Sequence, residues 1–123
     1  MIIGIGCDIV EHNTTKLLKW ESDSNLLHRI FSTKELELYN IQKKTEFIAG
    51  RFAAKEAVLK CLGTGMRDGI SLPDIQILRL ENGKPIVKLG GDVKEISDKL
   101  GIGSWHISIT HTTNYSYAFV IAE

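Results

Sequence analysis

One long, weakly charged helical segment constrains the fold of this chain more than any other feature. Residues 45–62 form it, and the sequence Gly63-Thr64-Gly65 that follows is typical of a helix stop. The rest of the segment is largely apolar or alanine, and its charged residues are Glu46, Arg51, Lys55, Glu56 and Lys60. Such a composition predicts a central, heavily buried helix around which the other segments pack.

The first segment, residues 1–10, is predicted to be a buried β-strand because it is rich in β-branched residues. Its side chains alternate between two faces, with Ile3, Ile5, Cys7 and Ile9 on one and Gly4, Gly6 and Asp8 on the other. We expect the isoleucine face to be the core face. Asp8 then emerges on a face of bare backbone, which something can approach closely.

The remaining segments predict more helices and paired strands. Strands at 75–80 and 85–89 flank Asn82-Gly83, a strong hairpin signal, and two further strands are expected at 105–110 and 117–122. Asn13 can cap one helix, and a capping box of Ser32 and Glu35 begins another. A short helix precedes Gly101. This order predicts an α+β fold, an antiparallel sheet packed on the long central helix, in a single domain of residues 1–123.

Bulk composition excludes several classes of protein. Fifteen basic residues balance fifteen acidic ones, so the chain lacks the basic excess of a nucleic-acid binder. No apolar run reaches the length of a membrane span, and no leader is recognised, which predicts a cytoplasmic protein. Cys7 and Cys61 lack metal-ligand spacing and are expected to be core residues.

Acidic and basic residues near the central helix form the first candidate site. Glu56 and Lys60 lie four residues apart, so they share one helix face. They could form a simple surface ion pair, but a charge on a buried helix needs a purpose. Asp8 and Glu56 could instead hold a hard cation such as Mg²⁺, with Lys60 neutralising the phosphates that complete its shell.

The strand at 105–110 supplies the second candidate site. His106, Ser108 and Thr110 point to one face, which could be an ordinary solvent-exposed polar face. The same row of imidazole and hydroxyl groups also suits phosphate oxygens, and His111 follows at the strand end. No Walker loop is present, because Gly63-Thr64-Gly65 lacks the required lysine and hydroxyl residue.

Taken together, these pieces resemble the holo-acyl-carrier-protein synthase family of 4′-phosphopantetheinyl transferases over nearly the whole chain. The resemblance is carried by residues 4–11 (GIGCDIVE), 29–32 (RIFS) with Glu35, 47–57 (FIAGRFAAKEA) with Lys60, 82–85 (NGKP) and 106–112 (HISITHT). Any one of these would be weak, whereas all five in this order are specific.

The resemblance implies a role for each candidate residue. Asp8 and Glu56 would hold Mg²⁺ against the pyrophosphate of coenzyme A, which Lys60 would also contact. His106 would lie near the metal-bound water or a phosphate. The groups implied around the ribose 3′-phosphate are Ser108, Thr110 and His111, and those lining the adenine are Gly83 and Pro85.

The resemblance also implies partners and an assembly. The implied partner is an acyl carrier protein, and family members of this length are usually homotrimers with active sites shared between subunits. Thr14 stands where the family commonly has an arginine that meets the carrier, so Lys16, Lys19 and Arg29 are expected to supply the positive patch instead. Cys7 replaces threonine, valine or leucine, and no consequence is expected.

The implied reaction moves the 4′-phosphopantetheine group of coenzyme A to a carrier serine, in support of fatty acid biosynthesis. Its phosphoryl transfer needs positioning and charge neutralisation more than covalent help from the protein. A metal-bound water oriented by Glu56, or His106, could take the serine proton. The alternatives are a non-catalytic coenzyme A-binding module and a metal-dependent hydrolase.

Overall fold

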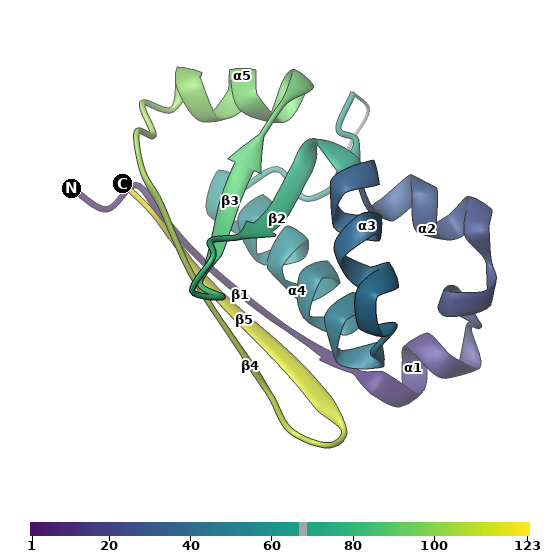
Figure 1. Cartoon of the computed structure of the whole chain (residues 1–123). Coiled ribbons are helices and arrows are strands. Elements are labelled where there is room, and N and C mark those ends of the chain that lie inside the picture. Colours follow the sequence, from purple (N-terminus) through teal and green to yellow (C-terminus); the bar gives the residue numbers. More distant parts are fainter. Residues whose placement is uncertain (67–68) are drawn as a thin grey trace.

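The central helix organises the molecule as predicted. The computed structural model describes residues 1–66 and 69–123, and α4 (Thr45–Leu62) has the predicted bounds. Gly63 ends it in the left-handed conformation, with φ of 73°. Ile48, Ala53 and Val58 are among its many fully buried residues. Figure 1 shows α4 lying across a three-stranded sheet, and this helix supplies more of the core than any other described element.

The three-stranded sheet is antiparallel and has the order β1-β5-β4. Its strands are β1 (Gly4–Glu11), β5 (Tyr115–Ala122) and β4 (Trp105–His111). In the register, Asp8 lies opposite Ala118, which in turn lies opposite Ile109. Helix α4 packs mainly on β1 and β5, and the molecule therefore has the α+β architecture that the sequence predicts.

A separate hairpin packs beside this sheet. It pairs β2 (Ile75–Arg79) with β3 (Pro85–Leu89), as the Asn82-Gly83 signal predicts, and Gly83 has a φ of 89°. Strand β3 runs close to β4, and α5 (Gly91–Lys99) follows it at the edge of the molecule (Figure 1). The hairpin thus brings its turn toward the same sheet that carries β4.

Three further helices and two short 3₁₀ turns complete the described part of the chain. The helices are α1 (His12–Leu17), α2 (Ser24–Ile30) and α3 (Thr33–Gln42), and the turns are η1 (Trp20–Ser22) and η2 (Leu72–Asp74). The predicted capping box at Ser32 and Glu35 is confirmed, since each donates a backbone N–H to the other's side chain. Asn13 does not cap α1, which begins one residue earlier, and α2 was not expected.

Glu35 also forms a buried ion pair with Lys55 of α4. Both side chains are fully buried, and Lys55 Nζ lies 2.7 Å from Glu35 Oε1. The lysine donates further hydrogen bonds to the carbonyls of Leu72 and Ile75, and the other Glu35 oxygen accepts from Ile77 N. Burial lowers the pKa of Lys55, although Glu35 opposes the shift. The pair therefore ties α3 and β2 to the central helix.

The predicted orientation of the first strand is wrong. Gly4 and Gly6 face α4, whereas Ile5, Cys7 and Ile9 point away from it and are exposed in the single chain. The glycines allow the strand backbone to lie against the helix backbone. The glycine face of β1, rather than its isoleucine face, is therefore the one that α4 covers. Of the two cysteines expected in the core, Cys61 is buried and Cys7 is not.

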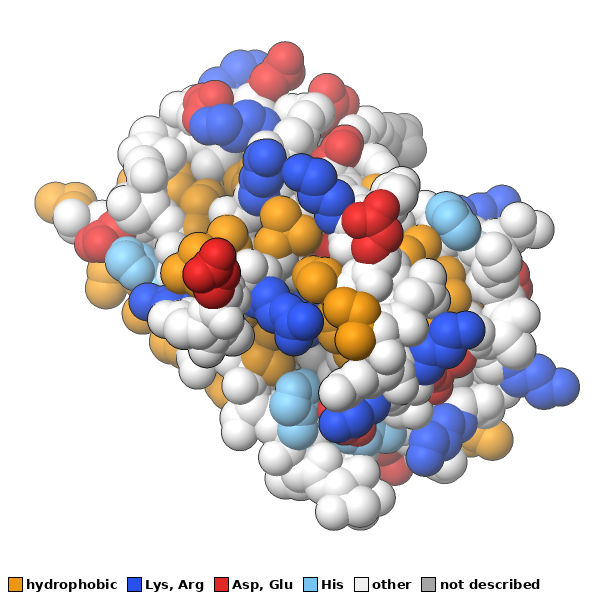
Figure 2. Space-filling view, in the orientation of Figure 1, with side chains coloured by type: hydrophobic (Ala, Val, Ile, Leu, Met, Phe, Trp, Pro, Cys, Tyr) orange, Lys and Arg blue, Asp and Glu red, His pale blue; other side chains and the backbone are white. Residues whose placement is uncertain are grey.

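The surface agrees with the balanced composition. Figure 2 shows acidic and basic side chains interspersed over the visible face, without a continuous basic field. Among the described residues, no helix combines the length and apolar character needed to span a bilayer.

Candidate active site

Asp8, Glu56 and Lys60 form a cluster where β1 crosses α4. Lys60 Nζ lies 3.3 Å from Asp8 Oδ1 and donates to the carbonyl oxygen of Cys7 at 2.9 Å. Glu56 lies one turn earlier on the same helix and is near enough to Asp8 for their charges to interact. The structure therefore joins three residues that the sequence places in two distant segments. Lys60 forms its ion pair with Asp8 rather than with Glu56.

The two glycines of β1 position Asp8. A Cβ atom on Gly6 would collide with the backbone carbonyl of Ala57, and one on Gly4 would collide with that of Cys61. Side chains of β1 alternate, so Asp8 is the next residue after Gly6 on the helix-facing side. The close approach of the two backbones thus brings this carboxylate beside Glu56.

The electrostatics of this cluster favour binding of a cation. Burial raises the pKa of Glu56, the neighbouring Asp8 raises it further, and Lys60 opposes the shift. Two neighbouring carboxylates repel one another, and a bound cation removes this repulsion by neutralising their charge. Within residues 1–66 and 69–123, no cluster of three potential metal-ligating side chains occurs, so a metal here would need other ligands as well.

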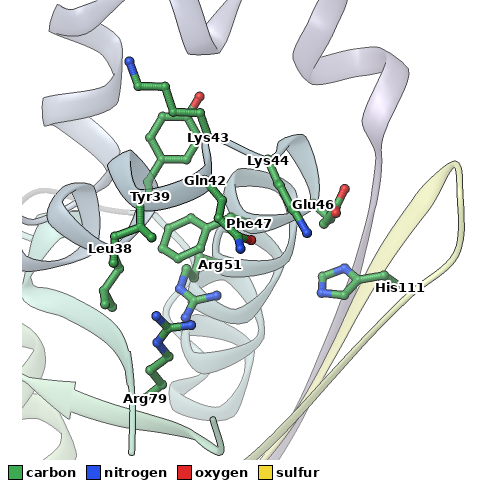
Figure 3. A pocket seen from close by; sticks show the side chains of 11 residues that line it. Leu38, Tyr39, Gln42, Lys43, Lys44, Glu46, Phe47, Arg51, Arg79 and His111 are labelled. Carbon is green, nitrogen blue, oxygen red and sulfur yellow. The ribbon is translucent and has the colours of Figure 1, made fainter. Parts of the chain in front are cut away.

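A basic pocket lies between α3, α4, β2 and the end of β4 (Figure 3). Its charged and imidazole-bearing residues are Lys43, Lys44, Glu46, Arg51, Arg79 and His111. The Arg51 guanidinium carbon lies 3.8 Å from the centre of the Phe47 ring, and its Nε donates to Ile77 O at 3.2 Å. Burial lowers the pKa of Arg51 to about 10, so it remains cationic at neutral pH. The pocket suits an anion.

His111 enters this pocket from the sheet. Figure 3 shows its ring pointing from the strands toward the helix that bears Glu46 and Arg51. Gly50 makes room for the ring, because a Cβ there would lie 2.7 Å from His111 Cε1. The His111 Nδ1 atom lies 2.7 Å from Ser116 Oγ, which also lies 2.7 Å from Nε2 of His12. Three segments therefore fix this imidazole.

The polar row on β4 lies on the other face of the sheet. His106, Ser108 and Thr110 are exposed there, while Trp105, Ile107 and Ile109 turn toward the core. His106 Nε2 lies 2.8 Å from a Glu123 carboxylate oxygen. Because Asp8 and His111 occupy the helix-facing side, one chain does not bring this row to either of them.

Comparison with known proteins identifies the family. The family model of the 4′-phosphopantetheinyl transferase superfamily matches residues 4–120. The chain belongs to this superfamily. The holo-[acyl-carrier-protein] synthase of Hydrogenovibrio crunogenus is 41% identical over 124 residues, which cover 100% of this chain and 98% of the relative. That of Clostridium novyi is 44% identical over 100% of this chain and 88% of its own length.

Solved structures of superfamily members have the same fold. The crystal structure of holo-[acyl-carrier-protein] synthase from Neisseria meningitidis matches with a TM-score of 0.91 and 34% identity, over 100% of this chain and 99% of that one. The Helicobacter pylori enzyme, solved in complex with coenzyme A, matches with a TM-score of 0.85 and 32% identity, over 97% and 99% of the chains. The predicted family and fold are confirmed.

The hairpin that carries Gly83 and Pro85 contributes one residue, Arg79, to the pocket. Pro85 pairs with Arg79, and Arg79 lines the pocket. Gly83 would meet no atom within 4 Å if it carried a Cβ, so its turn leaves open space beside it. Of this hairpin, Arg79 lines the pocket, whereas Gly83 and Pro85 do not.

Sequence reasoning missed several residues of the pocket. Arg51 carried a usable signal, because it is a charge on a helix predicted to be buried. Lys44 and Arg79 carried none, since each belongs to a separate segment and only the tertiary fold joins them. His12, which bonds Ser116 behind His111, was likewise not anticipated.

Proposed function

We propose that this protein transfers the 4′-phosphopantetheine group of coenzyme A to a serine of apo-acyl carrier protein, in support of fatty acid biosynthesis. The main observation in support of this proposal is the cluster of Asp8, Glu56 and Lys60 at the crossing of β1 and α4. The relatives of this chain are named for the same reaction, and three of the matched structures contain coenzyme A or a part of it. The reaction is proposed to take place in the cytoplasm, where coenzyme A is available.

The bond changes are those of one displacement. The serine oxygen of the carrier forms a bond to the β-phosphorus of coenzyme A, and the bond from that phosphorus to the bridging oxygen breaks. Adenosine 3′,5′-bisphosphate leaves with the bridging oxygen. Lys60 would stabilise the negative charge that gathers on these oxygens, as a fixed cation in a partly buried site can.

Asp8 and Glu56 are the proposed Mg²⁺ ligands. The ion requires few carboxylates and takes its other ligands from water and substrate phosphates, which fits a site with two acidic side chains. When bound there, Mg²⁺ would neutralise charge on the pyrophosphate. We also assign Glu56 a second role, in which its carboxylate accepts a hydrogen bond from the water that takes the serine proton and so orients that water. Oxygen ligands would accept Mn²⁺ as well.

The basic pocket is the proposed site of the coenzyme A 3′-phosphate. Arg51 and His111 would contact this phosphate, and the neighbouring turn with Gly83 and Pro85 would line the adenine. Ser108, Thr110 and His106 face the other side of the sheet, so we assign them to a site completed by another subunit.

A homotrimer with shared active sites is supported by the outer face of the sheet. Ile5 and Ile9 of β1 are 58% and 59% exposed, and Tyr117 of β5 lies opposite Ile9. Phe119 and Ile121 continue the same row, opposite Cys7 and Ile5. An apolar face beside the polar row of β4 suits burial against a second copy of this chain.

Carrier docking is proposed on α1 and α2. Lys16, Lys19 and Arg29 are exposed, and Leu17 and Leu18 are 73% and 59% exposed between the two lysines. Basic side chains around an apolar centre suit an acidic helical partner, because charge steers the encounter and apolar contact holds it. Thr14 stands where the family commonly has an arginine, and this patch would take over the role of that arginine.

Mass spectrometry of the carrier tests the proposed function. Apo-acyl carrier protein incubated with this protein, coenzyme A and Mg²⁺ should gain the mass of one phosphopantetheine group. The gain should disappear when Mg²⁺ is chelated, and in Asp8→Ala and Glu56→Ala variants that remain folded. Near-normal activity of either variant at limiting Mg²⁺ would contradict the metal assignment.

The same assay separates the alternatives. No mass gain, with coenzyme A still bound, would favour the non-catalytic binding module. Release of free phosphopantetheine without a carrier would favour the hydrolase. The binding module does not explain why both carboxylates and Lys60 meet at one point, since simple binding does not require all three.

A further inference from the structure

One hydroxyl group joins two histidines between helix α1 and the β4–β5 hairpin. Ser116 Oγ lies 2.7 Å from Nε2 of His12 and 2.7 Å from Nδ1 of His111. On the far side of the first ring, Nδ1 of His12 lies 3.1 Å from the carbonyl oxygen of Thr113. Ser116 and His12 are buried, while the His111 ring reaches the basic pocket (Figure 3).

The direction of these hydrogen bonds follows from the one partner that cannot donate. A carbonyl oxygen only accepts, so Nδ1 of His12 carries a hydrogen and donates to Thr113. His12 is 4% exposed, and its two ring nitrogens bond the Thr113 carbonyl and the Ser116 hydroxyl, so we assign the ring the tautomer with its hydrogen on Nδ1. Its Nε2 then accepts from the Ser116 hydroxyl, and the Ser116 oxygen accepts from Nδ1–H of His111.

We propose that His12 and Ser116 are positioning residues that hold His111 as the Nδ1–H tautomer, so that its Nε2 faces the basic pocket and takes up a proton when a phosphate binds. This inference rests on the proposed function, which places a phosphate of coenzyme A there. The bond from Nδ1–H to Ser116 is the same for the neutral and the charged ring. Protonation therefore adds one donor at Nε2 without turning the ring.

Charged and titratable groups from several elements face His111 and govern this proton uptake. They are Glu46 and Arg51 on α4, Lys43 and Lys44 just before it, Arg79 on β2 and His12 on α1. Burial lowers the pKa of His111, Glu46 opposes this, and Arg51 lowers it further. A phosphate favours the imidazolium, so coenzyme A affinity should rise as the pH falls from about 8 to about 6.

Nitrogen NMR on the full chain with isotopically labelled histidine tests the tautomer. His111 signals, assigned with the His111→Gln variant, should show a neutral Nδ1–H ring before ligand and an imidazolium after coenzyme A is added. A neutral Nε2–H ring before ligand would overturn the proposal, as would coenzyme A binding without protonation of His111. If coenzyme A shifts no signal, the proposed function fails, and the ligand-free tautomer alone upholds or overturns the role of His12 and Ser116.

Kinetics of Ser116→Ala supply an independent readout. Losing the bond that orients a charged donor should raise the KM for coenzyme A about tenfold, with kcat little changed because the phosphate is remote from the transferred group. His12→Gln keeps an acceptor for the Ser116 hydroxyl and should lie closer to wild type. Ser97→Ala, which truncates a buried serine on α5, is the matched control. Equal KM values for Ser116→Ala and Ser97→Ala would contradict the positioning role.

Discussion

Gly6 of β1 lies directly against the backbone carbonyl of Ala57 on α4, with no room between them for a Cβ atom. Gly4 meets the carbonyl of Cys61 one helical turn further on in the same way. This contact of strand backbone with helix backbone sets the depth at which Asp8 meets Glu56 and Lys60. A packing feature of the core therefore determines the geometry of the proposed metal site.

Gly6→Ala should damage both the fold and the site. A methyl group here meets backbone rather than a flexible side chain, so the strand must move away, at a cost of about 1–3 kcal/mol or more. Urea unfolding should show this loss. In the fraction that remains folded, the Mg²⁺ concentration needed for half-maximal activity should rise because Asp8 moves with the strand.

Gly103→Ala is the control for this substitution. A Cβ at Gly103 meets no atom within 4 Å and its φ is not positive, so the variant should unfold at nearly the wild-type urea concentration. Equal losses in Gly6→Ala and Gly103→Ala would show that the close approach of β1 and α4 is unimportant.

Glu56→Gln should stabilise the metal-free protein at neutral pH. The folded-state pKa of Glu56 is raised by burial and by Asp8, so the ionised carboxylate destabilises the folded state. The stability that the protonated group contributes is present below about pH 4.5 and is lost as the pH rises through the folded-state pKa. The melting temperature of Glu56→Gln in a chelator should therefore exceed that of wild type at pH 7 but not at pH 4.

Added Mg²⁺ should reverse this order. The ion should raise the melting temperature of wild type and leave that of Glu56→Gln nearly unchanged, because one of its two ligands is gone. Glu95→Gln, on an exposed position of α5, should behave as wild type in both conditions. An equal Mg²⁺ response of wild type and Glu56→Gln would exclude Glu56 as a ligand.

Local signals in the sequence predicted the elements of the fold well. The bounds of α4, the capping box at Ser32 and Glu35, and the turn at Gly83 each depend on a few neighbouring residues, and all were confirmed. The face of β1 that meets the core was predicted wrongly, because alternation alone does not say which row is inside. Isoleucine is a common core residue, yet in β1 the glycine face packs against the backbone of α4 and the isoleucine face is exposed.

The candidate site divides in the same way. Asp8, Glu56 and Lys60 were found together through the motif and the helical spacing, and the structure joins them. The basic pocket combines side chains from α3, α4, β2 and β4, so no local pattern could reveal it. His111 and Ser108, three residues apart on one strand, lie on opposite faces of the sheet, so the two do not meet in one chain.

Lys55→Met should be among the most damaging single substitutions outside the site. It leaves the buried Glu35 carboxylate without its cation, and breaking such a pair costs about 3–5 kcal/mol. Urea unfolding at neutral pH measures this loss. The double variant Glu35→Leu with Lys55→Met should recover part of it, since no unpaired charge remains.

The exposed pair of Lys94 and Asp98 on α5 provides the comparison. Its Lys94→Met variant should lose at most about 0.5 kcal/mol, because exposed pairs four residues apart on a helix contribute little. Similar losses of unfolding free energy for Lys94→Met and Lys55→Met would show that burial does not make the Glu35–Lys55 pair more important for stability than an exposed pair.

Reversing the charges of Lys16 and Lys19 should weaken the carrier interaction selectively. Both are exposed on or beside α1, where they would attract an acidic partner, and steering by charge acts mainly on the association rate. The Lys16→Glu, Lys19→Glu variant should raise the KM for carrier several-fold at low salt and leave the KM for coenzyme A unchanged. An unchanged carrier KM would remove this patch from the docking surface.

Ile9→Asp should separate the proposed subunits. Ile9 is 59% exposed in one chain and lies opposite Tyr117 on the outer face of the sheet, so a carboxylate would be buried there in a homotrimer. Sedimentation should give the mass of three chains for wild type and of one chain for the variant. Activity should fall with the mass, because the row with His106, Ser108 and Thr110 could no longer reach a neighbouring site. Leu100→Asp, at an exposed apolar position beyond α5, should keep the wild-type mass, and a single-chain mass for wild type would contradict the trimer.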